Sequence, residues 1–209
     1  MGKREKLRRY KRHCHKGKRS AVINKIIKAN GYKKHLEIGV YRSDANFDKI
    51  KVDYKVGVDP GKEGLSEATF TMKSDEFFEL TDDKFDIVFV DGLHHAEQVY
   101  KDIINSLEVL NEGGTIVCHD MNPQIYQHQV IPQVPGIWNG DCWKAFVQLR
   151  MERDDLKMCV IDADWGLGII QRGSQKKVET SELTFDNFDK NRNEWLNLIS
   201  EKEFFENWL

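Results

Sequence analysis

The segment from Phe85 to Asp120 constrains the fold most, because it reads as two buried strands joined by a helix. The run from Ile87 to Val90 is short, apolar and rich in β-branched residues, which is typical of a strand buried on both faces. Apolar residues then recur at helical spacing from Ala96 to Leu110, and a glycine pair separates them from a second apolar run, Ile116 to Cys118. This order predicts parallel strands joined by a right-handed crossover.

Polar residues follow both strands at the points where the strands end. Because the carboxyl ends of parallel strands meet at one edge of a sheet, ligands of open α/β sheets bind there. An acid after a strand also often caps the next helix, but its repetition at two successive strands favours a functional site. Six polar residues are expected at this edge: Asp91, His94, His95, His119, Asp120 and Asn122.

The rest of the chain continues the alternation of strands and helices. The fold class predicted is therefore α/β, with a seven-stranded, mostly parallel sheet, a terminal antiparallel hairpin and helices on both faces. The further elements expected are helices over 20–29, 43–51 and 141–153, a helical turn from Ser74, and strands over 34–38, 55–58, 69–72, 156–161 and 167–171.

Three parts of the chain differ in composition. Residues 1–19 read as a basic flexible arm, residues 20–175 as the α/β domain, and residues 176–209 as an amphipathic helical tail. The aromatic residues of the tail predict that it packs on the domain or at a homodimer interface. Residues 121–140 have no periodicity, and a loop of this length inside a domain is typical of a lid or substrate surface.

The charge is distributed asymmetrically. Residues 1–20 contain ten Lys and Arg and one Glu, a charge of +9, so the rest must carry −11 to give the net charge of −2. Such an arm suits nucleic acid, anionic lipid or an acidic partner, and the alternative is a solvating tail. His13-Cys14-His15 could hold a metal, but no second Cys/His cluster supports a finger.

Composition favours a cytoplasmic protein. No apolar run approaches the roughly 18 residues that a membrane span needs. No apolar stretch follows the basic N-terminus, so it does not read as a secretory signal. The four cysteines lack CxxC spacing, which is consistent with a reducing compartment.

A second set of candidate residues follows the first two strands. Gly39 ends the first strand and allows a close backbone approach, and Asp59 ends the second strand twenty residues later, where an acid can accept ribose hydroxyls. A dinucleotide site would need GxGxxG, and the second and third glycines are absent after Gly39. Glu37, two residues before Gly39, suits a ligand that carries an amine.

These residues resemble motif I of the class I S-adenosylmethionine-dependent methyltransferases, an acid–x–Gly pattern after the first strand. The resemblance covers most of residues 20–172 and implies a Rossmann-like fold with S-adenosylmethionine as cofactor. It places Glu37 near the methionine amino group, Asp59 at the ribose and Ser74-Asp75 near the adenine. Tyr41 and Ser43 stand where many members have glycine. The cofactor-binding residues implied are Glu37, Gly39, Tyr41, Ser43, Asp59, Ser74, Asp75 and Asp91.

The polar cluster resembles the metal site of the catechol-type and macrolide-sugar O-methyltransferases (Methyltransferase domain 24 type). The resemblance implies that Asp91, His119 and Asp120 hold a divalent ion, Mg²⁺ or Mn²⁺, although the family usually has an acid at the position of His119. Imidazole at that position favours a transition metal. His94 occupies the position of the general base, and His95 is the alternative.

The function implied is metal-assisted O-methylation of a small hydroxylated acceptor such as a sugar or glycoconjugate. A divalent cation would stabilise the alkoxide while a histidine takes its proton. Two alternatives keep the fold: a nucleic-acid methyltransferase guided by the basic arm, and a non-catalytic scaffold that binds S-adenosylmethionine. The core lacks the alternation of aromatic and basic residues that stacks bases.

Overall fold

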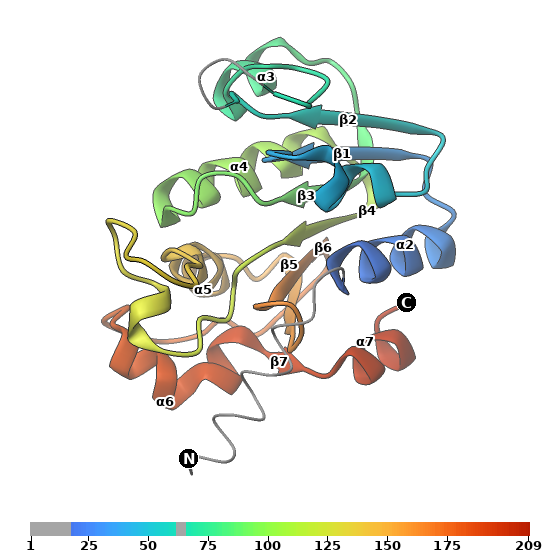
Figure 1. Cartoon of the computed structure of the whole chain (residues 1–209). Helices are drawn as coiled ribbons and strands as arrows, with labels where there is room; N and C mark the ends of the chain where they lie inside the picture. Colours follow the sequence, from blue (N-terminus) through green and yellow to red (C-terminus); the bar gives the residue numbers. More distant parts are fainter. Residues whose placement is uncertain (1–17, 62–65) are drawn as a thin grey trace.

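A computed structural model describes residues 18–61 and 66–209, and it contains one seven-stranded sheet in the order β2-β1-β3-β4-β6-β5-β7 (Figure 1). The pairs β2–β1, β1–β3, β3–β4 and β5–β7 are parallel, whereas β4–β6 and β6–β5 are antiparallel. The predicted fold class is confirmed. The strands are β1 (Lys34–Ile38), β2 (Tyr54–Val58), β3 (Phe85–Val90), β4 (Leu110–Cys118), β5 (Leu156–Ile161), β6 (Leu167–Arg172) and β7 (Leu198–Ile199).

Helices cover both faces of the sheet (Figure 1). On one face lie α2 (Lys18–Asn30) and α7 (Glu201–Asn207). On the other lie α3 (Ser74–Leu80), α4 (Ala96–Val109), α5 (Cys142–Glu152) and α6 (Phe185–Leu196). Short 3-10 turns span Ser43–Ala45, Phe47–Lys49 and Tyr126–His128.

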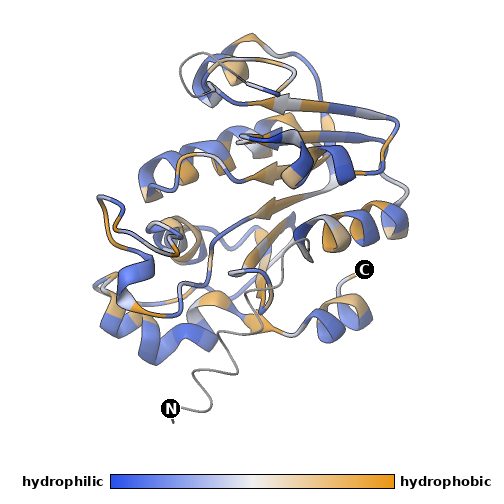
Figure 2. Cartoon of the chain, in the orientation of Figure 1, coloured by the Kyte–Doolittle hydropathy of each residue, from blue (hydrophilic) through white to orange (hydrophobic). Residues whose placement is uncertain are grey.

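Strand β3 is one of the apolar strands at the centre of the sheet (Figure 2). Ile87 and Phe89 pack into the core under α2, while Val88 and Val90 pack into the core under α4 and α5, and all four are buried. Successive strand residues point to opposite faces, so a strand between two helix layers buries side chains on both faces, which favours an apolar run such as Ile87 to Val90.

Two predicted elements are wrong. The helix over 43–51 is two 3-10 turns, because Asn46 has a non-helical backbone (φ −144°) and its amide donates to Glu37 at 2.8 Å. The strand over 69–72 is reduced to one bridge, Val58 with Phe70, because α3 begins at Ser74 and leaves no length for a ladder. Strand β2 is therefore the sheet edge.

The seventh strand comes from the tail instead. Asn197 ends α6 in the left-handed conformation (φ 44°), and Leu198–Ile199 then pairs with β5. Phe188, Trp195 and Phe204 are buried in the two cores of the domain. These side chains pack on the domain, and the homodimer interface stays a prediction.

Most of the predicted basic arm, including His13-Cys14-His15, lies outside the described residues. Its last two residues, Lys18 and Arg19, are the first two of α2. Across the described ranges, no helix combines the length and apolar character that crossing a membrane requires.

Candidate active site

A cavity of about 710 Å³ opens at the carboxyl ends of β1 to β4, a size typical of small-molecule and cofactor sites. Ten of the residues singled out from the sequence line this one cavity. They are Glu37, Gly39, Tyr41, Asp59, Ser74, Asp75, Asp91, His94, His119 and Asp120.

The turn after β1 depends on Gly39. Its φ is +91°, and a Cβ at this position would collide with the backbone carbonyl of Asp91. The amide of Gly39 donates to Val58 at 2.8 Å, and the amide of Asp91 donates to Ile38 at 2.8 Å. These bonds hold the ends of β1, β2 and β3 together. Because any side chain at position 39 would meet the backbone of Asp91, only glycine allows this close approach.

Two acids at this turn are held in fixed orientations. Glu37 is buried at 1% exposure and accepts the bond from Asn46. The carboxylate of Asp59 accepts the backbone amides of Tyr41 at 2.8 Å and Gly61 at 2.7 Å. Each oxygen of Asp59 keeps a lone pair for a ligand hydroxyl, which fits the ribose position that the resemblance implies.

Gln98 organises the polar group at the far end of the cavity. Its amide donates to Asp75 at 2.9 Å, to Ser74 at 3.3 Å and to Asp102 at 3.1 Å. Asp102 is buried on α4, and burial is the main cause that raises its pKa to about 6, against the hydrogen bonds that lower it. Sequence reasoning missed Gln98, since a glutamine in the first turn of a helix carries no distinct signal.

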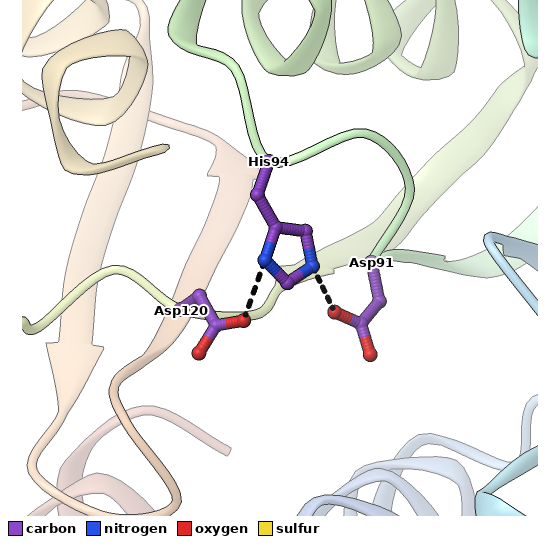
Figure 3. Close-up of side chains that lie close together, drawn as sticks. All are labelled: Asp91, His94 and Asp120. Carbon is purple, nitrogen blue, oxygen red and sulfur yellow. Dashed lines mark ion pairs between the residues drawn. The ribbon is translucent and has the colours of Figure 1, made fainter. Parts of the chain in front are cut away.

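At the other end, the imidazole of His94 lies between two carboxylates (Figure 3). Its Nε2 is 3.4 Å from Asp91 Oδ1, and its Nδ1 is 3.3 Å from Asp120 Oδ2. Donor atoms of these three residues all lie within 4.8 Å of one another, a spacing that could hold a metal ion. The Nδ1 atom is buried without a hydrogen bond of good geometry, so the group fits a divalent cation.

His119 touches the same two carboxylates from the buried side. Its Nδ1 lies 3.2 Å from Asp91 Oδ1 and 3.1 Å from Asp120 Oδ2, and its Nε2 lies 3.6 Å from Asp164 Oδ1. The ring is 4% exposed, against 22% for His94. His94 is therefore the histidine that faces the cavity more openly.

Arg19 also reaches this cluster and lines the cavity. Its Nη1 donates to Asp91 Oδ2 at 2.6 Å, and its backbone amide donates to Asp164 Oδ2 at 2.9 Å. Sequence reasoning placed Arg19 in the arm and Asp164 in a hairpin turn. Neither position carries a local pattern that would predict a site residue.

The charges of the cluster shift its pKa values in opposite directions. Burial opposes ionisation of Asp91, but His119, His94 and Arg19 outweigh it and lower the pKa of Asp91. Burial likewise opposes the charged form of both histidines, yet the carboxylates of Asp91 and Asp120 raise the pKa of His94 and of His119. Asp91 therefore stays ionised, and a cation that binds at the cluster would replace the protons of the two histidines.

The irregular segment 121–140 closes one side of the cavity. Trp138 stacks on His94 with ring centroids 5.2 Å apart and an interplanar angle of 19°. The indole of Trp138 donates to the Val130 carbonyl at 2.7 Å, and the amide of Asn139 donates to Asp120. The loop is predicted to form a substrate surface, and Trp138 and Asn139 are the two residues that bring it into contact with the cluster.

Three residues expected at the site lie outside the cavity lining. Ser43 bonds Glu67 and Asp48 on the turn after β1. His95 precedes α4, with its ring edge-on to Trp138 at 6.3 Å. Asn122 donates to Asp162 and accepts from Arg192, because the chain turns away from the sheet after Asp120 (φ 64°). The roles assigned to Ser43 and His95 gain no geometric support.

Comparison with known proteins gives the family. The sequence matches the Methyltransferase domain family over residues 14–121, which is 108 of 209 residues. Searching the curated proteins gives no match.

Solved structures share the fold at low sequence identity. The O-methyltransferase TomG from Streptomyces achromogenes, involved in tomaymycin synthesis and solved with S-adenosylmethionine, is 15% identical with a TM-score of 0.55, over 78% of this chain and 82% of that one. The methyltransferase PaMTH1 from Podospora anserina, bound to S-adenosylhomocysteine, is 16% identical with a TM-score of 0.53, over 75% and 78%. With more than half of its length matched and the same fold as these enzymes, the chain belongs to the Methyltransferase domain family, the class I S-adenosylmethionine-dependent methyltransferases.

Proposed function

We propose that the protein transfers a methyl group from S-adenosylmethionine to a hydroxyl of a small acceptor, such as a sugar or glycoconjugate, with the help of a divalent cation, Mg²⁺ or Mn²⁺. The observation that carries this proposal is that one cavity joins the Glu37–Gly39–Asp59 turn to the Asp91–His94–Asp120 cluster. A cofactor and an acceptor bound in one cavity can bring their reacting atoms together.

The cofactor end uses residues that the fold holds rigidly. Glu37 would meet the methionine amine and Asp59 the ribose hydroxyls, with Ser74, Asp75 and Gln98 at the adenine. Bound S-adenosylmethionine would supply an electrophilic methyl group. The relatives TomG and PaMTH1, solved with S-adenosylmethionine and S-adenosylhomocysteine, support this assignment.

At the acceptor end, Asp91 and Asp120 would ligate the cation, and His119 would add a nitrogen. A ligating histidine usually donates from its second ring nitrogen to a carboxylate, and the Nε2 of His119 lies 3.6 Å from Asp164 Oδ1, close enough for an ion pair but too far for a hydrogen bond. The cation would supply positive charge beside an alkoxide. His94, which is more exposed than His119, would take the hydroxyl proton as general base.

The test is calorimetry with S-adenosylhomocysteine in the presence and absence of Mn²⁺, followed by an acceptor screen with labelled S-adenosylmethionine. We expect S-adenosylhomocysteine to bind and a hydroxylated acceptor to be labelled. If the protein bound NAD and not S-adenosylhomocysteine, the assignment of the cofactor end would be wrong. A cofactor that binds with no acceptor labelled across sugars, phenols and nucleic acids would favour a scaffold.

A further inference from the structure

We infer that Arg19 is a positioning residue that orients Asp91 for the divalent cation, so that the first turn of α2 completes the site. The inference rests on the proposed function, since it concerns the cation assigned to Asp91 and Asp120. Nothing in the sequence pattern of residues 1–20 separates Arg19 from the other nine basic residues there.

The two oxygens of Asp91 have different partners. Oδ2 accepts from Arg19 Nη1 at 2.6 Å. Oδ1 faces the histidines, at 3.2 Å from His119 Nδ1 and 3.4 Å from His94 Nε2. The same His119 nitrogen lies 3.1 Å from Asp120 Oδ2. Arg19 thus holds Oδ2 and leaves Oδ1, the oxygen beside both histidines, to a cation, while its Nη1 also lies 3.2 Å from Nδ1 of His119.

Arg19 is itself held in place. Its side chain is 26% exposed, its Nε lies 3.6 Å from Asp164 Oδ2, and its backbone amide donates to the same carboxylate at 2.9 Å. Asp164 sits in a β5–β6 turn with a left-handed backbone (φ 45°). An arginine fixed at its backbone and its side chain loses little freedom when it orients a neighbour.

The local charge also fits this role. When a cation has replaced the histidine protons, the ionised carboxylates of Asp91, Asp120 and Asp164 contribute −3 and Arg19 contributes +1, which leaves −2. A divalent cation balances that sum. Without Arg19 the site would be one charge more negative, but Asp91 would be free to rotate away from Asp120. Replacing a residue that hydrogen-bonds to a metal ligand typically changes the metal affinity by about 10- to 100-fold.

The experiment is a Mn²⁺ titration of the full chain followed by electron paramagnetic resonance of the free ion. We expect Arg19→Ala to bind Mn²⁺ about 10- to 100-fold more weakly than wild type. Arg19→Lys should fall between them, because lysine restores the charge but not the planar fork. The matched control is Arg42→Ala, since Arg42 forms an exposed pair with Asp44 outside the cavity lining, and it should bind as wild type does.

Melting temperature and S-adenosylhomocysteine affinity separate positioning from folding. Both should be unchanged in Arg19→Lys while its Mn²⁺ affinity falls. Equal Mn²⁺ affinity in wild type and Arg19→Ala would overturn the inference. Tighter binding would also overturn it and make Arg19 a competitor of the cation, since Nη1 lies 3.2 Å from His119 Nδ1. If wild type bound no Mn²⁺, the cation part of the proposed function would fall as well.

Discussion

The Nε2 atom of His94 lies 3.4 Å from Oδ1 of Asp91, which directly follows β3 and precedes His94 by three positions. A loop without helix or strand connects them, and Trp138 covers the other side of the imidazole. Asp91 is therefore proposed to do two things: it orients His94, the proposed base, and it ligates the cation.

Replacing this base should separate turnover from binding. We expect His94→Ala to reduce methyl transfer by roughly 10²- to 10⁴-fold, the usual contribution of a positioned acid–base group. Its affinity for S-adenosylhomocysteine should stay within about twofold of wild type, because that ligand depends on the residues of the turn after β1. His95→Ala is the neighbouring control and should keep most activity. A tenfold loss of Mn²⁺ affinity in His94→Ala would show that His94 is a ligand instead.

The pH dependence of transfer should respond to the cation. Although burial opposes it, the carboxylates of Asp91 and Asp120 raise the pKa of His94, and only the neutral imidazole accepts a proton. Turnover should therefore rise with pH, and saturating Mn²⁺ should move the rise to lower pH, since added positive charge disfavours the imidazolium. The measurement is turnover against pH at two Mn²⁺ concentrations. The explanation would be contradicted if the midpoint of the pH profile did not change with Mn²⁺, or if the same pH profile were found in His94→Ala.

The carboxylates should account for any cation requirement. Asp91→Asn and Asp120→Asn each remove a charged ligand, so we expect both variants to lose at least tenfold in Mn²⁺ affinity. Their transfer rate should approach that of wild type treated with a chelator. Asp44→Asn, at 72% side-chain exposure, is the control. Transfer that continues unchanged after exhaustive chelation would exclude a catalytic role for the ion.

The ribose position can be tested without turnover. Asp59→Ala removes a carboxylate that the amides of Tyr41 and Gly61 hold at the cavity wall. We expect S-adenosylhomocysteine binding to weaken by about 1.5–3 kcal/mol, the range for a lost hydrogen bond to a charged group. Asp53→Ala is the matched control, because Asp53 precedes the opposite end of β2 and is 77% exposed. Calorimetry that finds both variants equal to wild type would remove Asp59 from the site.

Asp102 should make stability depend on pH. Burial raises its pKa to about 6 from a reference of 3.8, so the folded state binds this proton more tightly than the unfolded state does. The protonated carboxyl adds at most about 3 kcal/mol to the free energy of unfolding. This stabilisation is fully present below about pH 4 and is lost as the pH rises through 6. We expect Asp102→Asn to unfold at higher urea than wild type at pH 8 and not at pH 4. Equal destabilisation at both pH values would contradict this cause.

The central strand–helix–strand unit and the acids that follow its two strands could be predicted from local residue patterns. The apolar runs that became β3 and the end of β4, and the helical spacing that became α4, depend on burial patterns within about 35 residues. Because parallel strands end at one edge, Asp91 and Asp120 had to lie near each other wherever the rest of the chain went. Gly39 and Asp59 followed from the same rule.

The residues that surround those acids could not be predicted in the same way, because they come from distant parts of the chain. Arg19 and Asp91 are 72 positions apart, and their contact exists because α2 packs its apolar side on the sheet with its first turn at the cavity. Asp164 reaches Arg19 through a tight turn with left-handed residues, and Leu198–Ile199 became a strand because β5 offered a free edge. Such contacts depend on how whole elements dock, and no local periodicity encodes docking.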